Sequence, residues 1–419
     1  MSNLPSNTAR GGLVITIALC FMVALMEGLD LQAPGIAAQG MMSAFSIDKL
    51  HMGWVFSAGV MGMLPGAFLG GRLADRYGRK YVLMASVALF GVFSLVTAEA
   101  WDFNSLIAAR FLTGAGLGAS LPNLIALTSE VAGPKFRGTA VSMMYCGVPL
   151  GAAGAALFGV NDFGLGWQLV FYVGGIVPLL IVPLLAVYLP ESKAFSGTMQ
   201  DTLRVSTLLF AKGNAKPTLL LWASFFFTLM VTYILINWLP SLLVAQGFSG
   251  KNASWVVLTM QLGATIGTLM LGMLMDRVPT WVMSLIIYIG MLVALMGLYV
   301  STTLIGMLVA GFLAGIFTTG GQSVLYALAP LFYPVKGRAT GVGTAVAIGR
   351  LGAMSGPLVA GKMLALGTCT AGVMLSCMPG IVVAAVSLCY LSVVKSGTSF
   401  ATPDSDTPVV QSSETQAPT

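Results

Sequence analysis

Long apolar runs separated by short polar segments repeat along the whole 419-residue chain. A run of roughly 20 apolar residues is long enough to cross the hydrocarbon core of a bilayer as an α-helix. The pattern predicts twelve such helices, at residues 13–35, 52–72, 82–100, 104–127, 139–160, 168–189, 217–245, 252–275, 281–300, 304–327, 338–361 and 369–394. We therefore predict an all-α membrane protein with two six-helix bundles, 13–189 and 217–394.

Three polar segments flank the predicted bundles. Residues 1–12 form an N-terminal tail, residues 190–216 link the bundles, and residues 395–419 form a C-terminal tail rich in Ser, Thr, Pro and Asp. The composition of the C-terminal tail is typical of disordered segments, because it offers few apolar side chains to bury.

Composition and charge agree with a membrane protein. Only 8% of the residues are charged, whereas a soluble domain carries about 25%. Of the 20 Lys and Arg residues, fifteen fall on the side that holds both termini, three on the other side and two within spans. Cytoplasmic segments are enriched in Lys and Arg, so we expect both termini and the linker in the cytoplasm of a bacterium, with the bundles in its inner membrane. This asymmetry accounts for the net charge of +6, and we expect no nucleic-acid partner.

The two predicted bundles are related by an internal repeat with an offset of 201 residues and no insertion. Chance similarity between apolar helices does not readily place charged loop residues in register. Two parallel six-helix halves are typical of transporters whose substrate site lies between the halves at mid-membrane. The offset places Gly71, Asp75, Arg76 and Arg137 on Gly272, Asp276, Arg277 and Arg338.

Four charged residues lie within predicted spans: Glu27, Asp30, Arg110 and Arg350. A charge at the bilayer centre costs about 2.5–3.5 kcal/mol on insertion scales, so such charges indicate a functional site or a structural ion pair. Glu27 and Asp30 are three residues apart and are expected to share a helix face. A carboxyl group shielded from water binds a proton more readily. Glu27 and Asp30 are therefore candidate proton carriers, with Arg110 as a candidate partner, and a structural ion pair is the alternative.

The two arginines are also candidates for binding an organic anion, because a guanidinium group matches a carboxylate in a forked geometry. Either Arg110 or Arg350 is expected to bind the anion, or to release Asp30 when the anion arrives, and the sequence leaves open which does which. Aromatic and polar side chains can sandwich and orient an aromatic substrate. The candidates are Tyr145, Tyr233, Asn237, Gln322 and Tyr326, with ordinary helix packing as the alternative. Asp30 is also a candidate substrate-binding residue, beside the two arginines.

Other chemistries are not indicated by the sequence. Gly114, Gly116 and Gly118 in the fourth predicted span lack the preceding strand and the Lys-Ser/Thr ending of a phosphate-binding loop. Small residues in an apolar helix indicate close helix packing instead. The five cysteines show no metal-ligand spacing. We therefore expect no ATP-driven step, no metal and no cofactor, and we do not expect an enzyme.

The segment after the second predicted span reads Gly71-Arg72-Leu73-Ala74-Asp75-Arg76-Tyr77-Gly78-Arg79-Lys80. It resembles the signature loop of the major facilitator superfamily, which has a Gly, three residues, Asp-Arg, any residue, Gly-Arg and a basic residue. The resemblance implies a polar latch that locks the cytoplasmic side in the outward-open state, with a topology anchor as the alternative. We expect Gly71 to let a neighbouring helix approach closely. The residues assigned to the latch are Gly71, Asp75, Arg76, Gly78, Arg79, Glu130, Arg137, Asp276, Arg277 and Arg338.

The string Glu27-Gly28-Leu29-Asp30 resembles the acidic-Gly-x-Asp motif of the aromatic acid:proton symporter branch of that superfamily, in which the first acidic residue is usually Asp. The resemblance covers residues 13–394 and implies proton-coupled uptake of a hydroxylated phenylpropanoid acid, or a close hydroxybenzoate, by alternating access. The further strings that carry it are 121–130, 145–149, 236–240, 321–330 and 338–367.

Two other functions fit the same fold. One is export of drugs or aromatic metabolites by proton antiport, and the other is a membrane sensor that binds the same acid without transporting it. The partners we expect are a small aromatic acid, protons and the lipid bilayer, and we expect the protein to act as a monomer.

Overall fold

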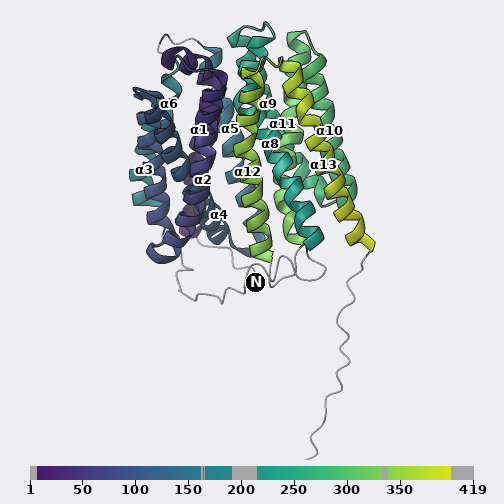
Figure 1. Ribbon diagram of the computed structural model, residues 1–419. Helices are drawn as coiled ribbons and strands as arrows, with labels where there is room; N and C mark the ends of the chain where they lie inside the picture. The colour runs from purple at the N-terminus through teal and green to yellow at the C-terminus, as the bar shows by residue number, and fades with distance from the viewer. Residues whose placement is uncertain (1–6, 162–163, 165, 191–214, 333–337, 398–419) are drawn as a thin grey trace, which may run out of the picture.

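The computed structural model describes residues 7–161, 164, 166–190, 215–332 and 338–397, and within them the side chains of residues 7–12, 133–137, 338–340 and 394–397 are not described. The described residues form helices without strands, and twelve segments are long and apolar enough to cross a membrane. The predicted all-α membrane fold is therefore confirmed (Figure 1). The helices are α1 (Asn7–Phe45), α2 (Lys49–Tyr77), α3 (Arg79–Ala98), α4 (Phe103–Tyr145), α5 (Gly147–Val160), α6 (Leu169–Tyr188), α8 (Ala215–Ala245), α9 (Gly250–Met275), α10 (Thr280–Val300), α11 (Leu304–Leu328), α12 (Arg338–Ala365) and α13 (Thr370–Gly397), with the 3-10 turn η1 (Ala329–Phe332) after α11.

Two predicted span boundaries are wrong. Helix α1 continues to Phe45, ten residues past the predicted end at 35, because the extension buries Ala37, Ala38 and Met41 although Gln39 and Gly40 interrupt the apolar run. The predicted break at residues 128–138 between the fourth and fifth spans is also absent. Helix α4 includes these residues and the first turns of the fifth span, which α5 completes.

Helices in the N-terminal half pack closely through glycines, as predicted for the fourth span. A Cβ atom added at Gly114 of α4 would collide with the backbone carbonyl of Gly59 on α2. One added at Gly151 of α5 would collide with the carbonyl of Leu25 on α1. The absence of a side chain at these positions lets the backbones approach each other.

The same two approaches recur in the C-terminal half. A Cβ atom at Gly315 would collide with the carbonyl of Met260, and one at Gly352 would collide with the carbonyl of Phe226. Each of these contacts is the corresponding N-terminal contact displaced by 201 residues. The repeat in the sequence is therefore a repeat of helix packing.

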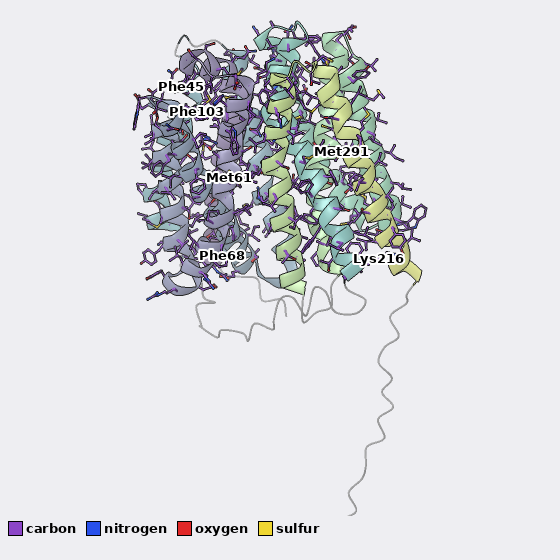
Figure 2. All side chains as sticks on the ribbon, in the orientation of Figure 1. Phe45, Met61, Phe68, Phe103, Lys216 and Met291 are labelled. Atoms are coloured by element: carbon purple, nitrogen blue, oxygen red, sulfur yellow. The ribbon has the colours of Figure 1, made fainter. Side chains whose placement is uncertain are left out.

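The two halves lie side by side, with α3 and α6 at one edge of the bundle and α10 and α13 at the other (Figure 1). The most extensive contacts between them are those of α1 with α8, α2 with α12 and α5 with α9. We call the end of the bundle that contains the α2–α3 turn at Gly78 the basic end, and the end that contains the α1–α2 turn at residues 46–48 the far end. Figure 2 labels Phe68 near the basic end and Phe45 near the far end.

Candidate functional site

Arg350 lies between the two halves near the middle of its span. It stands on α12, where its guanidinium Nη1 donates a hydrogen bond of 2.8 Å to the hydroxyl of Tyr233 on α8. The same nitrogen lies 3.6 Å from the sulfur of Met63 on α2, so Arg350 contacts both halves. The side chain is only partly buried, and it forms none of the ion pairs found among the described side chains.

Aromatic and amide groups surround this arginine. Tyr145 at the end of α4 and Tyr326 on α11 lie close enough to Arg350 to interact electrostatically with its charge. The amide of Gln322 donates to the Tyr326 hydroxyl at 3.3 Å, and the rings of Phe225 and Tyr326 meet edge to face at 5.4 Å. The structure thus brings four predicted binding residues, Tyr145, Tyr233, Gln322 and Tyr326, around Arg350.

Asn237 is not part of this cluster by its hydrogen bonds. It lies one turn beyond Tyr233 on α8, and its amide donates to the backbone carbonyl of Tyr233 at 2.9 Å. Its own backbone carbonyl lies against Gly35 of α1. The structure therefore places Asn237 at the contact between α8 and α1, toward the far end, rather than beside the guanidinium group.

Glu27 reaches the same region from α1. It is 4% exposed and accepts a hydrogen bond from the Ser120 hydroxyl on α4. It is also close enough to Arg350 to interact electrostatically with the guanidinium group. The next residue, Gly28, explains part of the acidic-Gly-x-Asp motif. A Cβ atom there would collide with the carbonyl of Val148 on α5, so only glycine lets α1 sit against the fifth span.

Asp30 lies inside the N-terminal half and is fully buried. One guanidinium nitrogen of Arg110, Nη1, donates to both carboxylate oxygens, at 3.2 and 3.1 Å. The Ser94 hydroxyl on α3 donates to the same carboxylate at 3.1 Å, and the Arg110 guanidinium lies 5.6 Å from the ring centre of Phe171 on α6. Arg110 is therefore paired with Asp30. Of the two arginines within predicted spans, Arg350 is the one that forms no ion pair with a described carboxylate.

The two carboxylates thus have separate partners, which the predicted shared face did not indicate. Glu27 meets Ser120 and the charge of Arg350, whereas Asp30 meets Arg110 and Ser94. A single helix, α1, carries one acidic group toward the junction of the halves and another into the core of its own half.

A polar bridge between the halves was missed by sequence reasoning. The amide of Gln32 on α1 donates to the carbonyl of Ile236 on α8 at 2.8 Å, and the amide of Gln261 on α9 donates to the Gln32 oxygen at 2.7 Å. Ser57 on α2 adds a hydrogen bond of 2.7 Å to the carbonyl of Met354 on α12. The sequence did contain an indication of this contact. The 201-residue offset places Gln32 at the position that corresponds to Tyr233, which is a predicted binding residue.

These bridging contacts show which end of the bundle is closed. Among the described residues, the hydrogen bonds between the halves lie near Arg350 or toward the far end. Close backbone approaches agree, since Gly53 of α2 lies against Pro357 of α12 and Gly159 of α5 lies against Ser254 of α9. The halves are therefore joined at the far end, whereas at the basic end a Cβ atom at Gly71 or Gly272 would meet nothing within 4 Å.

The predicted latch residues lie at the basic end, and only some of them interact. Arg79 forms an ion pair with Glu130, and Gly78 ends α2 with a φ of 96° that favours glycine. Asp75 and Asp276 are exposed and have no ion-pair partner among the described side chains. Arg76 lies over the ring of Tyr77, and Arg277 is exposed. The side chains of Arg137 and Arg338 lie outside the described residues.

The expected close helix approach at Gly71 is wrong in this conformation. A Cβ atom added there would meet nothing within 4 Å, and the same holds for its repeat partner Gly272. The preceding residue, Gly70, packs on Ala119 of α4 instead. Gly71 therefore faces open space in the conformation described.

Among the described residues, no group of three or more His, Cys, Asp or Glu side chains is arranged to hold a metal ion. Among the described residues, the buried charged side chains are Glu27, Asp30 and Arg110, and Arg350 is partly buried beside them. These groups can exchange hydrogen-bond and ion-pair partners with one another.

Comparison with known proteins identifies relatives over nearly the whole chain. The model of the Major Facilitator Superfamily matches residues 20–304 and 221–414. The chain is 62% identical over 391 residues to the 3-(3-hydroxy-phenyl)propionate transporter of Escherichia coli strain K12, covering 93% of this chain and 97% of that one. It is 35% identical over 392 residues to a 4-hydroxybenzoate transporter of Pseudomonas aeruginosa, covering 84% of this chain and 86% of that one.

A solved structure has the same fold. The crystal structure of a D-xylose-proton symporter superposes with a TM-score of 0.73 at 17% sequence identity, covering 89% of this chain and 97% of that chain. At this identity the likeness concerns the arrangement of the helices.

Proposed function

The chain belongs to the major facilitator superfamily and is a multi-pass membrane transporter, and from that premise we propose that it imports an aromatic carboxylate together with protons by alternating access. The proposed substrate is 3-(3-hydroxyphenyl)propionate or a close phenylpropanoid or hydroxybenzoate acid. The relatives named for transport of such acids support this choice, and the 62% identity extends over nearly all of both chains.

The observation that carries the proposal is the state of Arg350. This arginine is partly buried at the junction of the halves and is held by a phenol, with no carboxylate in ion-pair contact among the described side chains. A buried cation is stable when an anion or several hydrogen-bond acceptors compensate it. We assign the substrate carboxylate to this guanidinium, which offers a forked set of donors, and the substrate ring to the surrounding tyrosines.

Two groups are assigned to proton coupling. Glu27 is buried on α1 near Arg350, and we assign it to bind a proton when the substrate carboxylate occupies that arginine. Asp30 is neutralised by Arg110, and a proton on Asp30 would release that arginine. One proton carried with one monoanion moves no net charge, and the pH gradient then supplies about 1.4 kcal/mol per pH unit. A second proton adds about 2.3 kcal/mol per 100 mV of membrane potential.

We assign the basic end to the cytoplasm, with both termini on that side, because Lys and Arg concentrate there. With this orientation the far-end contacts close the periplasmic side, and the described conformation is inward-facing. The exposed Asp75 and Asp276 support this assignment, because a latch that holds the outward-open state should be released when the cytoplasmic side is open. We further propose that the transporter acts as a monomer in a bacterial inner membrane.

The test is uptake of radiolabelled 3-(3-hydroxyphenyl)propionate by cells that lack their own aromatic acid carriers and express this chain. Inverted and right-side-out vesicles with an imposed pH gradient then give the direction of coupling. Accumulation on the alkaline side, driven by protons moving with the acid, supports symport. Movement of the acid against the proton flux contradicts symport in favour of export, and saturable binding without flux contradicts it in favour of a sensor.

A further inference from the structure

Ser94 stands between two acceptors in the core of the N-terminal half. Its hydroxyl oxygen lies 3.1 Å from Oδ1 of Asp30 and 3.1 Å from the backbone carbonyl oxygen of Phe171 on α6. The side chain is fully buried on α3. A hydroxyl group has one proton to donate and two lone pairs that accept, and its proton rotates to suit its neighbours. Ser94 can therefore donate to only one of the two oxygens at a time.

The two possible orientations match the two protonation states of Asp30. When the carboxylate is ionised, Ser94 donates to Oδ1. When the carboxyl group carries a proton on Oδ1, that proton can be donated to the Ser94 oxygen, and the Ser94 proton turns to the Phe171 carbonyl. Neither state leaves a donor of this pair without an acceptor. This matters because a buried polar group that lacks a partner costs about 1–3 kcal/mol.

Arg110 holds Asp30 in a way that permits this change. A single nitrogen, Nη1, serves both carboxylate oxygens, while Nη2 lies 3.5 Å from the Asp30 backbone carbonyl. The buried Nε has no hydrogen-bond partner among the described residues. The two-pronged pairing that makes an arginine–carboxylate contact strong is therefore not formed. Ser94 supplies the remaining side-chain hydrogen bond to the carboxylate that the structure describes.

The charged groups around Asp30 are few. Arg110 on α4 is the charged side chain in contact with it. On its own helix, Glu27 lies one turn earlier and is engaged by Ser120. The C-cap residue of α3, Glu99, and Tyr172 of α6 bond to each other at an exposed position beyond Ser94. Helix α5 has no ionisable residue.

On α2, the ionisable side chains lie in the terminal turns, and at mid-helix Gly59 faces the Arg110 guanidinium. On α8, Tyr233 is engaged by Arg350, and Lys216 lies in the first turn. The side-chain contacts of the Asp30 carboxylate that the structure describes are therefore those with Arg110 and Ser94.

From this geometry we propose that Ser94 is a positioning residue for proton coupling, whose hydroxyl can form a hydrogen bond with both the ionised and the protonated form of the buried Asp30 side chain. The proton comes from water on the side where the substrate enters and ends on Asp30 Oδ1. Ser94 keeps its own proton throughout and only changes the oxygen to which it donates it. The inference rests on the proposed proton-coupled transport. It adds to that proposal the group that keeps Asp30 hydrogen-bonded in both of its protonation states.

The experiment compares Ser94→Ala, Ser94→Thr and Ser94→Cys in the full chain. Ser94→Thr keeps the hydroxyl, and Ser94→Cys keeps the size but only a weak donor. Ser86→Ala is the matched control, because Ser86 is a buried serine of the same helix whose hydroxyl donates to the carbonyl of Val82 in its own helix. Proton-driven net uptake of 3-(3-hydroxyphenyl)propionate and substrate exchange at equal pH are both measured, each across external pH 5–8.

For Ser94→Ala and Ser94→Cys we expect net uptake to fall about tenfold with an altered pH profile, as for loss of a hydrogen bond to a charged group. The rate of substrate exchange at equal pH should stay within about twofold of wild type. During exchange the carrier crosses the membrane with substrate and proton both bound, so Asp30 does not have to release its proton. Ser94→Thr and Ser86→Ala keep the wild-type profile. An unchanged pH profile in Ser94→Ala overturns the proposal. An equal loss of uptake and exchange without rescue by Ser94→Thr also overturns it, since that result shows a structural role.

Failure of the proposed proton coupling can be distinguished from failure of the Ser94 inference. If wild-type uptake does not respond to a pH gradient, proton coupling itself is refuted and the Ser94 inference with it. If wild type is proton-driven and Asp30→Asn abolishes that drive while Ser94→Ala does not, only the inference about Ser94 is refuted.

Discussion

Arg350 donates a hydrogen bond to the hydroxyl of Tyr233, with 2.8 Å between the guanidinium nitrogen and the phenol oxygen. A phenol is a neutral acceptor, so it orients the guanidinium group without cancelling its charge. The arginine therefore keeps both its direction and its attraction for an anion. This arrangement distinguishes Arg350 from Arg110, whose charge is cancelled by Asp30 in the same membrane interior.

Removal of the Tyr233 hydroxyl is expected to weaken substrate binding. In Tyr233→Phe the guanidinium group loses its orienting partner, and KM for 3-(3-hydroxyphenyl)propionate should rise about tenfold, as for loss of one hydrogen bond to a charged group. The matched control is Tyr288→Phe, because Tyr288 is a buried tyrosine of the same half that bonds Thr228 instead. Equal KM values for the two variants in initial-rate uptake would show that the Tyr233 contact has no part in binding.

Breaking the Asp30–Arg110 pair from one side is expected to destabilise the protein. Asp30→Asn leaves Arg110 charged and uncompensated in a fully buried site, and removal of one partner of a buried pair typically costs about 3–5 kcal/mol. The double variant Asp30→Asn/Arg110→Gln has no buried charge there and should recover most of the thermal stability in detergent, while proton-driven uptake stays absent. A single variant as stable as the double one would argue against a buried charge at this site.

The glutamine bridge is expected to hold the far end closed. Gln261→Met keeps the size of the side chain but removes the amide that donates to Gln32. Loss of about 1 kcal/mol from the closed form shifts the equilibrium toward the outward-facing form by about fivefold. The shift is measured as faster labelling of Asn237→Cys by an impermeant maleimide added outside.

The control for the bridge is Thr268→Val, because the Thr268 hydroxyl bonds Ala264 within α9 and does not cross between the halves. It should leave the labelling rate unchanged. If the Asn237→Cys residue is labelled equally fast with and without Gln261→Met, the glutamine bridge does not help to close the far end.

Two glycines of α5 are expected to respond in opposite ways to a single methyl group. Gly151→Ala places a Cβ atom against the carbonyl of Leu25 and should lower the free energy of unfolding by about 1–3 kcal/mol through overpacking. Gly154→Ala adds a Cβ atom with nothing within 4 Å, and alanine favours the helix by about 0.8–1.0 kcal/mol. Thermal unfolding of both variants in detergent checks this contrast, and destabilisation of equal size would contradict the packing described for α1 and α5.

The fold was accessible from the sequence because the bilayer imposes strong constraints. Spanning segments must be helical and apolar over about 20 residues. The 201-residue offset also pairs Gly151 with Gly352, and these two glycines have the same packing role in the structure. The extension of α1 to Phe45 was not accessible, because it depends on what Met41 packs against rather than on local hydropathy.

The candidate site was accessible only in part. Charge made Glu27, Asp30, Arg110 and Arg350 conspicuous, but spacing along one helix does not show which partner a side chain meets on another. Uncharged groups are equally important here, and they carry no such signal. Ser94 resembles any other small residue of a packed helix until its hydroxyl is placed beside Asp30.

The closed end of the bundle could not be predicted at all. Inward-facing and outward-facing forms share one sequence and one set of helices, and they differ in free energy by only a few kcal/mol. The contact of Gln32 with Gln261 identifies the form described, whereas the expected contact at Gly71 is absent from it.

The most direct test is competition for binding between 3-(3-hydroxyphenyl)propionate and its uncharged amide, measured by calorimetry on the purified wild type and on Arg350→Gln. If the Arg350 guanidinium binds the substrate carboxylate, the wild type should prefer the acid by about a hundredfold or more, and Arg350→Gln should bind acid and amide with similar, weak affinity. An unchanged preference for the acid in Arg350→Gln would contradict the assignment of the anion site to Arg350.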